Sequence, residues 1–274
     1  IINTNMAQGV REITIKRGFD PREFPMVVAG GAGPNHACMI GQELDIPLLV
    51  VPRESSIFCA AGMLMSDLKH DFVRSYVGRI EDADWPRLNG LIDDMIGEGT
   101  ALLENEKIPD ERRRFLLTLD CRYVKQYHEV SYEVPLDAVR AADAERIKVD
   151  FHAEHNRLYG YSLEDQATPV EIINVRVQAV GVTEKPAFAE EDYAGADPTS
   201  ALKGEREVVV PETAERKLVP VYDGHATRFG HRISGPAIIE QQNTSILVTA
   251  TYDCVCDAYG SFAVYLKGRE DLVN

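Results

Sequence analysis

The sequence predicts an α/β fold in which a βαβ unit is followed by an α+β region and a small β-rich C-terminal domain. The βαβ unit is indicated by apolar runs at 25–29 and 46–51, which flank a helical pattern and a loop with three glycines in four residues. Strand, helix and strand in this order imply a parallel pair and a right-handed crossover. The other two regions are indicated by β-branched runs around a long helical pattern and by short strands after residue 205.

The first part of the chain is expected to begin with a helix over residues 1–17. Met6, Val10 and Ile13 recur there at the spacing of one helix face, and Gly18 follows where a C-cap glycine is expected. The elements after it are expected as a strand at 25–29, a helix over 35–44, a strand at 46–51, a small-residue helix after Ser55, a strand at 69–77 and an amphipathic helix over 84–106.

The second and third parts differ in their spacing of elements. The α+β region is expected to contain strands at 115–123 and 128–134, a helix over 136–159 and a strand at 170–182. Residues 184–204 show little periodicity of apolar side chains. Short strands are then expected at 208–210, 217–222, 237–240, 245–249 and 261–266, a spacing that suits a small β-sandwich or barrel. The expected domains are therefore 1–110, 111–183 and 205–274, with 184–204 as a linker or long surface loop.

Composition excludes several classes of function. The 274 residues carry a net charge of −15, which disfavours nucleic acid and anionic membranes as partners because phosphate contacts need clustered Lys and Arg. No apolar run of about 18 residues is present, and the first residues lack the basic and apolar regions of a signal peptide. Five cysteines without a C-x-x-C pair argue against a disulfide framework. A cytoplasmic location is expected.

The glycine loop is the strongest candidate site. Gly30, Gly31 and Gly33, with Ala32 and Pro34, lie between a strand and a helix start. Such a loop can bring backbone N–H groups and the helix dipole to a phosphate, although many α/β folds need a glycine turn for packing alone.

Several titratable residues are candidates for a catalytic role. His36 follows the loop and could face a phosphate or the transferred group, or it could be a helix residue whose ring is already hydrogen-bonded. Glu43 and Asp45 could supply a base, but they lie at the far end of the predicted helix. His70 and Asp71 could form a pair at a strand edge, which is more often structural.

A metal site is not expected. His152 and His155 are spaced by three on one predicted helix, and His128 precedes them. However, no carboxylate-rich ligand set and no H-E-x-x-H motif completes a site.

The sequence resembles the hydantoinase A/oxoprolinase family, which includes acetone and acetophenone carboxylase subunits. The resemblance follows the family's order along almost the whole chain. It is carried by RGFDPREF at 17–24, GGAGPNHA at 30–37, SDLKHD at 66–71, RYVKQ at 122–126, FH at 151–152 with YG at 159–160, VEIINVR at 170–176, GPAIIE at 235–240 and DAYG at 257–260.

The resemblance implies a fold similar to the actin-like ATPases, in which ATP occupies a cleft between two lobes. The segment Gly30–Pro34 resembles the second-lobe element on the adenosine and phosphate side, so that Gly30, Gly31 and Gly33 would contact nucleotide. The implied chemistry is ATP-dependent activation of a substrate carbonyl oxygen by phosphorylation, before hydrolysis of a cyclic amide or carboxylation of a ketone. The implied partner is a hydantoinase B-type subunit.

One expected motif is absent from these 274 residues. Family members carry an Asp-x-Gly-Gly-Thr loop in the first lobe, which binds magnesium and phosphate, and the resemblance here covers only the family's C-terminal part. We therefore expect a fragment, or a subunit completed by an N-terminal ATPase lobe chain that holds most of the Mg²⁺ contacts. Asn35 stands where an apolar residue is expected. Three functions remain open: a cyclic amide hydrolase subunit, a ketone carboxylase subunit, or a non-catalytic scaffold of such a complex.

Overall fold

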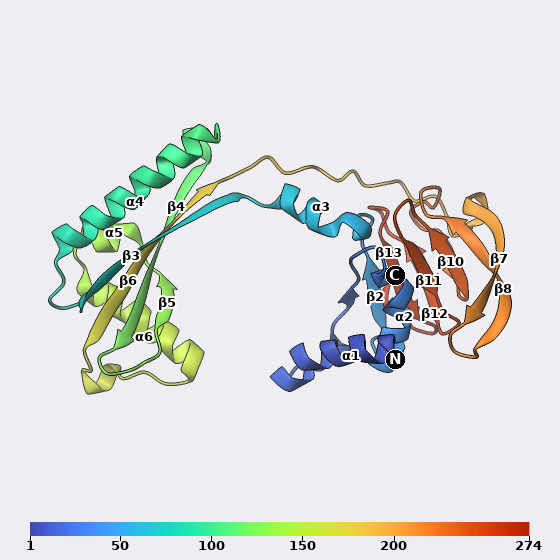
Figure 1. The fold of residues 1–274 in the computed structure, drawn as a ribbon, viewed down its shortest axis with the longest axis horizontal. Coiled ribbons are helices and arrows are strands. Elements are labelled where there is room, and N and C mark those ends of the chain that lie inside the picture. Colours follow the sequence, from blue (N-terminus) through green and yellow to red (C-terminus); the bar gives the residue numbers. More distant parts are fainter. Residues whose placement is uncertain (274) are drawn as a thin grey trace. The chain divides into compact units, whose positions relative to one another are not determined.

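A computed structural model describes residues 1–273 and divides them into two compact units (Figure 1). Of the described residues, unit 1 consists of 1–64 and 186–273, and unit 2 of 65–185. The short helix α3 (Phe58–Met65) lies at the boundary in the sequence. No helix of the described residues is long and apolar enough to cross a membrane.

Unit 1 contains two sheets, the helices α1 and α2, and most of α3. One sheet has the order β1-β2-β13-β12-β9 and the other β11-β10-β8-β7. The elements are α1 (Ile2–Ile13), β1 (Met26–Val27), α2 (Gly33–Glu43), β2 (Leu48–Val51), β7 (Leu202–Val210), β8 (Glu215–Asp223), β9 (Arg232–Ser234), β10 (Ala237–Glu240), β11 (Ser245–Val248), β12 (Tyr252–Cys256) and β13 (Phe262–Leu266).

The expected βαβ unit is confirmed. Strands β1 and β2 are parallel, with Met26 opposite Leu49, and α2 lies between them in the sequence. The carboxyl ends of both strands therefore meet at one edge of the sheet, where ligands of parallel sheets bind.

The C-terminal strands do not form a separate domain. Strand β2 pairs with β13 in antiparallel fashion, with Leu49 opposite Val264, so that residues from both ends of the chain share one sheet. One core cluster joins α2, β2 and both sheets, and it includes Leu49, Tyr252 and Ile239. The compact units therefore differ from the expected segments 1–110, 111–183 and 205–274. A pairing between strands about 200 residues apart leaves no local signal in the sequence.

Unit 2 is an α+β arrangement. Its antiparallel sheet has the order β3-β6-β4-β5 (Figure 1). The apolar side chains of its helices and strands form one core. The elements are β3 (Leu68–Arg79), α4 (Trp85–Asn105), β4 (Arg113–Tyr123), β5 (Val130–Glu133), α5 (Leu136–Arg140), α6 (Ala144–Tyr159) and β6 (Val170–Gly181).

The helix expected over 136–159 is two helices. Ala142 has a φ of +56°, which interrupts the helix, and Asp143 begins α6 by accepting a hydrogen bond from the backbone N–H of Arg146. Asp143 is a preferred N-cap residue, but alanine does not indicate a positive φ, and the apolar spacing continues across the break. Gly160 ends α6 in the left-handed conformation, as expected.

Candidate glycine-loop site

The glycine loop is fixed to the segment that follows β2. The backbone N–H of Val28 donates to the carbonyl oxygen of Val50 over 2.8 Å and extends the β1–β2 pairing. Gly30 has a φ of +92°, which favours glycine, and its N–H donates to the carbonyl oxygen of Ser55 over 2.7 Å. These two bonds hold the loop at the carboxyl edge of the sheet.

Gly31 and Gly33 each allow a close approach. An ideal Cβ on Gly31 would lie 3.3 Å from the carbonyl oxygen of Asn243, and the hydroxyl of Thr244 donates to the Gly31 carbonyl over 2.7 Å. A Cβ on Gly33 would lie 3.3 Å from Cγ1 of Val28. The absence of a side chain at Gly31 therefore allows the β10–β11 turn to lie close to the loop. The absence of one at Gly33 allows α2 to pack closely against Val28, directly after β1.

The loop and the helix start are accessible to a ligand. Gly30, Gly31 and Ala32 are exposed, whereas Pro34 is buried in the first turn of α2. Ala32, the N-cap residue, supplies no side-chain cap. Pro34 has no N–H, and the N–H of Asn35 donates to the carbonyl oxygen of Ala32 over 3.1 Å. The N-terminal end of α2 therefore presents chiefly the positive end of the helix dipole, without a competing carboxylate.

Ser55, whose carbonyl oxygen accepts the hydrogen bond from Gly30, also has a buried hydroxyl. Ser55 is 0% exposed, and its Oγ has no hydrogen-bond partner among residues 1–273. A buried hydroxyl without a partner is unfavourable for folding, so this group is a candidate ligand contact.

A small polar cavity lies beside the residues that precede Ser55 in the sequence. It has a volume of about 150 Å³ and is lined by Arg53 and Glu54, which precede Ser55, and by His225 and Arg228. The Nε2 atom of His225 accepts a 3.2 Å hydrogen bond from the backbone N–H of Gln242, in the turn that contacts Gly31. The cavity is therefore lined by two guanidinium groups and by the carboxylates of Glu54 and Glu191, and Arg53 forms a 3.7 Å ion pair with Glu54. No local pattern in the sequence indicates that these arginines or Thr244 lie near the loop, because they come from other segments of the chain.

His36 has a hydrogen-bond partner within the fold. Its Nδ1 lies 2.8 Å from Oδ1 of Asn3 on α1, and the side chain is partly buried. This contact favours the structural interpretation, in which the ring of His36 helps to join α1 to α2.

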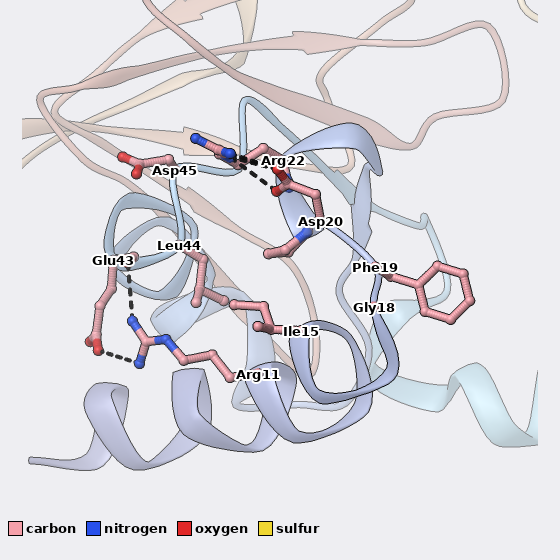
Figure 2. Close-up of a pocket in the computed structure, with 10 residues that line it drawn as sticks. Arg11, Ile15, Gly18, Phe19, Asp20, Arg22, Glu43, Leu44 and Asp45 are labelled. Atoms are coloured by element: carbon pink, nitrogen blue, oxygen red, sulfur yellow. Dashed lines mark hydrogen bonds and ion pairs between the residues drawn. The ribbon is translucent and has the colours of Figure 1, made fainter.

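Glu43 and Asp45 lie at the other end of α2. They line a cavity of about 510 Å³ next to α1, shown in Figure 2. Glu43 accepts from Arg11 over 3.2 Å, and on the opposite wall Asp20 and Arg22 form a 2.6 Å ion pair. The charged groups of this cavity other than Asp45 are engaged with one another, and α2 separates them from the glycine loop.

The remaining histidine candidates have other neighbours than those expected. His70 Nε2 contacts Glu106 over 3.0 Å, whereas Asp71 accepts from Gln178, so the two adjacent residues form no pair. Successive residues of a strand point to opposite faces, which is the reason.

His152 and His155 also take different partners. The Nδ1 of His152 lies 2.7 Å from the hydroxyl of Tyr123, and the Nδ1 of His155 lies 2.8 Å from the carbonyl oxygen of Tyr161. Within residues 1–273, no group of three or more His, Cys, Asp or Glu side chains is arranged to hold a metal ion.

Two family models match this chain. The hydantoinase/oxoprolinase model matches residues 1–72, and the hydantoinase/oxoprolinase C-terminal domain model matches residues 83–265. The chain is 28% identical over 251 residues to the caprolactamase subunit alpha of Pseudomonas jessenii, covering 90% of this chain and 36% of that protein. It is 29% identical over 268 residues to the acetophenone carboxylase gamma subunit of Aromatoleum aromaticum, covering 95% of this chain and 36% of that protein.

Two solved structures share the fold. The nucleotide-free acetone carboxylase matches with a TM-score of 0.81 at 22% identity, over 97% of this chain and 38% of that chain. The ATP-dependent caprolactamase from Pseudomonas jessenii matches with a TM-score of 0.66 at 27% identity, over 97% of this chain and 39% of that chain. The chain thus spans little more than a third of the length of these relatives. Because the two family models together cover most of it, the chain belongs to the hydantoinase/oxoprolinase family.

Proposed function

We propose that this chain supplies the second lobe of an actin-like ATP site in an ATP-dependent enzyme that acts on a substrate carbonyl group. The observation that carries the proposal is the exposed glycine loop at the carboxyl edge of a parallel strand pair, directly before an uncapped helix start. Family membership supports it, since solved relatives are described as ATP-dependent.

The residues of the loop suit the anionic part of a nucleotide. The backbone at Gly30, Gly31, Ala32 and Gly33 would lie against the adenosine and phosphate side, with Pro34 shaping the first turn of α2. Gly30 and Gly31 lack side chains that would block this approach, and the helix dipole favours negative charge there.

The neighbouring groups suit the same ligand. The hydroxyl of Ser55, which has no partner among residues 1–273, offers a hydrogen bond, and Arg53 and Arg228 offer positive charge in the neighbouring cavity, which Glu54 and Glu191 also line. ATP, when bound, supplies the phosphoryl group that activates the carbonyl oxygen of the substrate. Mg²⁺ would be held mainly by a first lobe outside these residues.

The whole enzyme would contain further parts. An N-terminal ATPase lobe and a hydantoinase B-type subunit would complete it, in the cytoplasm. We favour hydrolysis of a cyclic amide, which is supported by the match to a caprolactamase subunit. Carboxylation of a ketone is the alternative, which is supported by the match to an acetophenone carboxylase subunit. A scaffold role is the remaining alternative, and the intact glycine loop argues against it.

Substitution of Gly31 by valine tests the nucleotide site. Its Cβ would lie 3.3 Å from the carbonyl oxygen of Asn243, so the larger side chain must displace the β10–β11 turn or cover the loop. In the enzyme purified with its partner chains, Gly31→Val should weaken ATP binding at least tenfold, equivalent to about 1.4 kcal/mol, while the protein stays folded.

Gly9→Val is the matched control. Gly9 lies in α1, and nothing lies within 4 Å of its ideal Cβ, so ATP affinity should not change. Unchanged ATP affinity in Gly31→Val, measured by calorimetry, would refute the assignment of the loop. Native mass spectrometry of the purified enzyme should reveal the first lobe, on this chain or on a second one; its absence would favour the scaffold role.

A further inference from the structure

A second pocket lies within unit 2, between the β4–β5 turn and the end of α6. It has a volume of about 310 Å³. Its walls are formed by Lys125, Tyr127 and His128 of the turn and by His155, Tyr159 and Tyr161 of the helix end and the loop after it. None of these residues belongs to the glycine-loop site.

His155 presents an unpaired acceptor to this pocket. The side chain is 2% exposed, and its Nδ1 lies 2.8 Å from the carbonyl oxygen of Tyr161. A carbonyl oxygen can only accept, so Nδ1 carries the proton and Nε2 of the neutral ring carries a lone pair. Among residues 1–273, no group donates a hydrogen bond to this Nε2. His155 lines the pocket, so a ligand there can donate to this acceptor with an N–H or O–H group.

The rings around His155 hold it in place. The ring centroids of Tyr159 and Tyr161 lie 4.8 and 4.9 Å from that of His155, and Tyr123 lies at 4.9 Å on the core side. Tyr127, at 93% exposure, has almost no packing of its own. Aromatic faces that are fixed on one wall and free on the rim suit a flat ring as the ligand.

Lys125 contributes positive charge from a strained position. Its φ is +76°, in a turn closed by the hydrogen bond from the N–H of Gln126 to the carbonyl oxygen of Tyr123. Glycine suits this position of a turn, and a lysine there is strained. Strained side chains of this kind gather at binding sites. No carboxylate among residues 1–273 forms an ion pair with Lys125.

We propose that this pocket binds a small aromatic carboxylate whose ring carries an N–H or O–H donor. The donor bonds to Nε2 of His155, the carboxylate pairs with Lys125, and the ring packs against the tyrosines. The site lies in unit 2 and does not depend on nucleotide binding in unit 1.

Two nearly isosteric probes test the acceptor. Pyrrole-2-carboxylate carries a ring N–H beside its carboxylate, whereas furan-2-carboxylate has an oxygen in the same place. Titrated into the full chain, the pyrrole should bind about tenfold more tightly than the furan, because only it can donate to Nε2. The ¹⁵N resonance of His155 Nε2 should shift with the pyrrole and not with the furan. Equal affinities, or no saturable binding of the pyrrole up to about 10 mM, would overturn the proposal.

Substitutions of two lysines test whether the positive charge of Lys125 binds the carboxylate of the ligand. Lys125→Gly should weaken binding of pyrrole-2-carboxylate about tenfold without lowering the melting temperature, because glycine relieves the strained φ. Lys107→Gly is the matched control, since Lys107 is also exposed with a φ of +62°, in the turn after α4, and does not line the pocket. Its binding should equal that of the parent. Unchanged binding in Lys125→Gly, or equal losses in both variants, would refute the role of Lys125.

Discussion

The backbone N–H of Gly30 donates a 2.7 Å hydrogen bond to the carbonyl oxygen of Ser55, and this bond joins the ends of the two parallel strands. The positive φ of Gly30 directs the N–H toward Ser55 and leaves the following residues exposed. The same residue, Ser55, is fully buried, and its hydroxyl is without a partner among the described residues.

Replacement of Ser55 by alanine should separate stability from ligand binding. Removing a buried hydroxyl that lacks a partner should leave stability unchanged or raise it by about 1 kcal/mol. If the hydroxyl contacts nucleotide, ATP affinity of the complete enzyme should fall severalfold in the same variant. Urea unfolding and calorimetry measure the two effects. A loss of more than about 1 kcal/mol in stability would show that the hydroxyl has a partner in solution.

Gly41→Ala should destabilise unit 1 by about 1–3 kcal/mol, because the site is already filled. The new Cβ would lie 2.7 Å from the hydroxyl oxygen of Tyr252 and 2.9 Å from Cδ2 of Leu49. Gly9→Ala, in the exposed interior of α1, should instead gain about 0.5–1 kcal/mol from helix propensity.

Tyr252→Phe provides the internal check on this clash. Alone it should lose about 1 kcal/mol, since the hydroxyl donates to the carbonyl oxygen of Ile46 over 2.9 Å. In the Gly41→Ala background it should lose less, because the atom that clashes is removed. Strictly additive free energies of unfolding would contradict the packing described here.

Asp120→Asn should destabilise unit 2 by about 2–3 kcal/mol. Asp120 is 1% exposed and accepts from Ser131 over 2.6 Å, from Asn174 over 3.0 Å and from Arg176 over 2.8 Å. An amide cannot accept all of these donors, and the charge of Arg176 loses its partner.

Asp93→Asn is the matched control for that substitution. Asp93 and Arg140 form an exposed ion pair, so its loss should cost less than about 1 kcal/mol. Equal effects of the two substitutions in urea unfolding would show that the buried network does not stabilise the sheet.

Stability should fall as the pH drops below about 6.5, in part because of His152. Burial lowers the pKa of His152 in the folded state, and the opposing charge of Glu164 only partly offsets this. The unfolded chain therefore binds a proton first. The contribution is complete above pH 6.5 and is lost as the pH falls toward the folded pKa. His152→Gln should show a flatter decline of the free energy of unfolding between pH 7.5 and 5.5; identical slopes would contradict the assignment.

Local patterns in the sequence determined most single elements. The βαβ unit, α4, the strands of unit 2 and the glycine loop were all predicted from apolar spacing, caps and glycines, because these properties depend on neighbouring residues. The family was also recognisable from short motifs, and the family models confirm it.

Only the tertiary structure decided which distant segments meet. It pairs β2 with β13 and places the hydroxyl of Thr244 against the carbonyl oxygen of Gly31. It buries the hydroxyl of Ser55 without a partner among residues 1–273, and it gives His152 and His155 different hydrogen-bond partners. Such contacts join residues far apart in the chain, and their free energy comes from packing and hydrogen bonding in the assembled core rather than from local propensity. The sequence by itself therefore determined the position of the glycine loop between a strand and a helix. The tertiary structure determined which residues, such as Ser55 and Thr244, contact that loop.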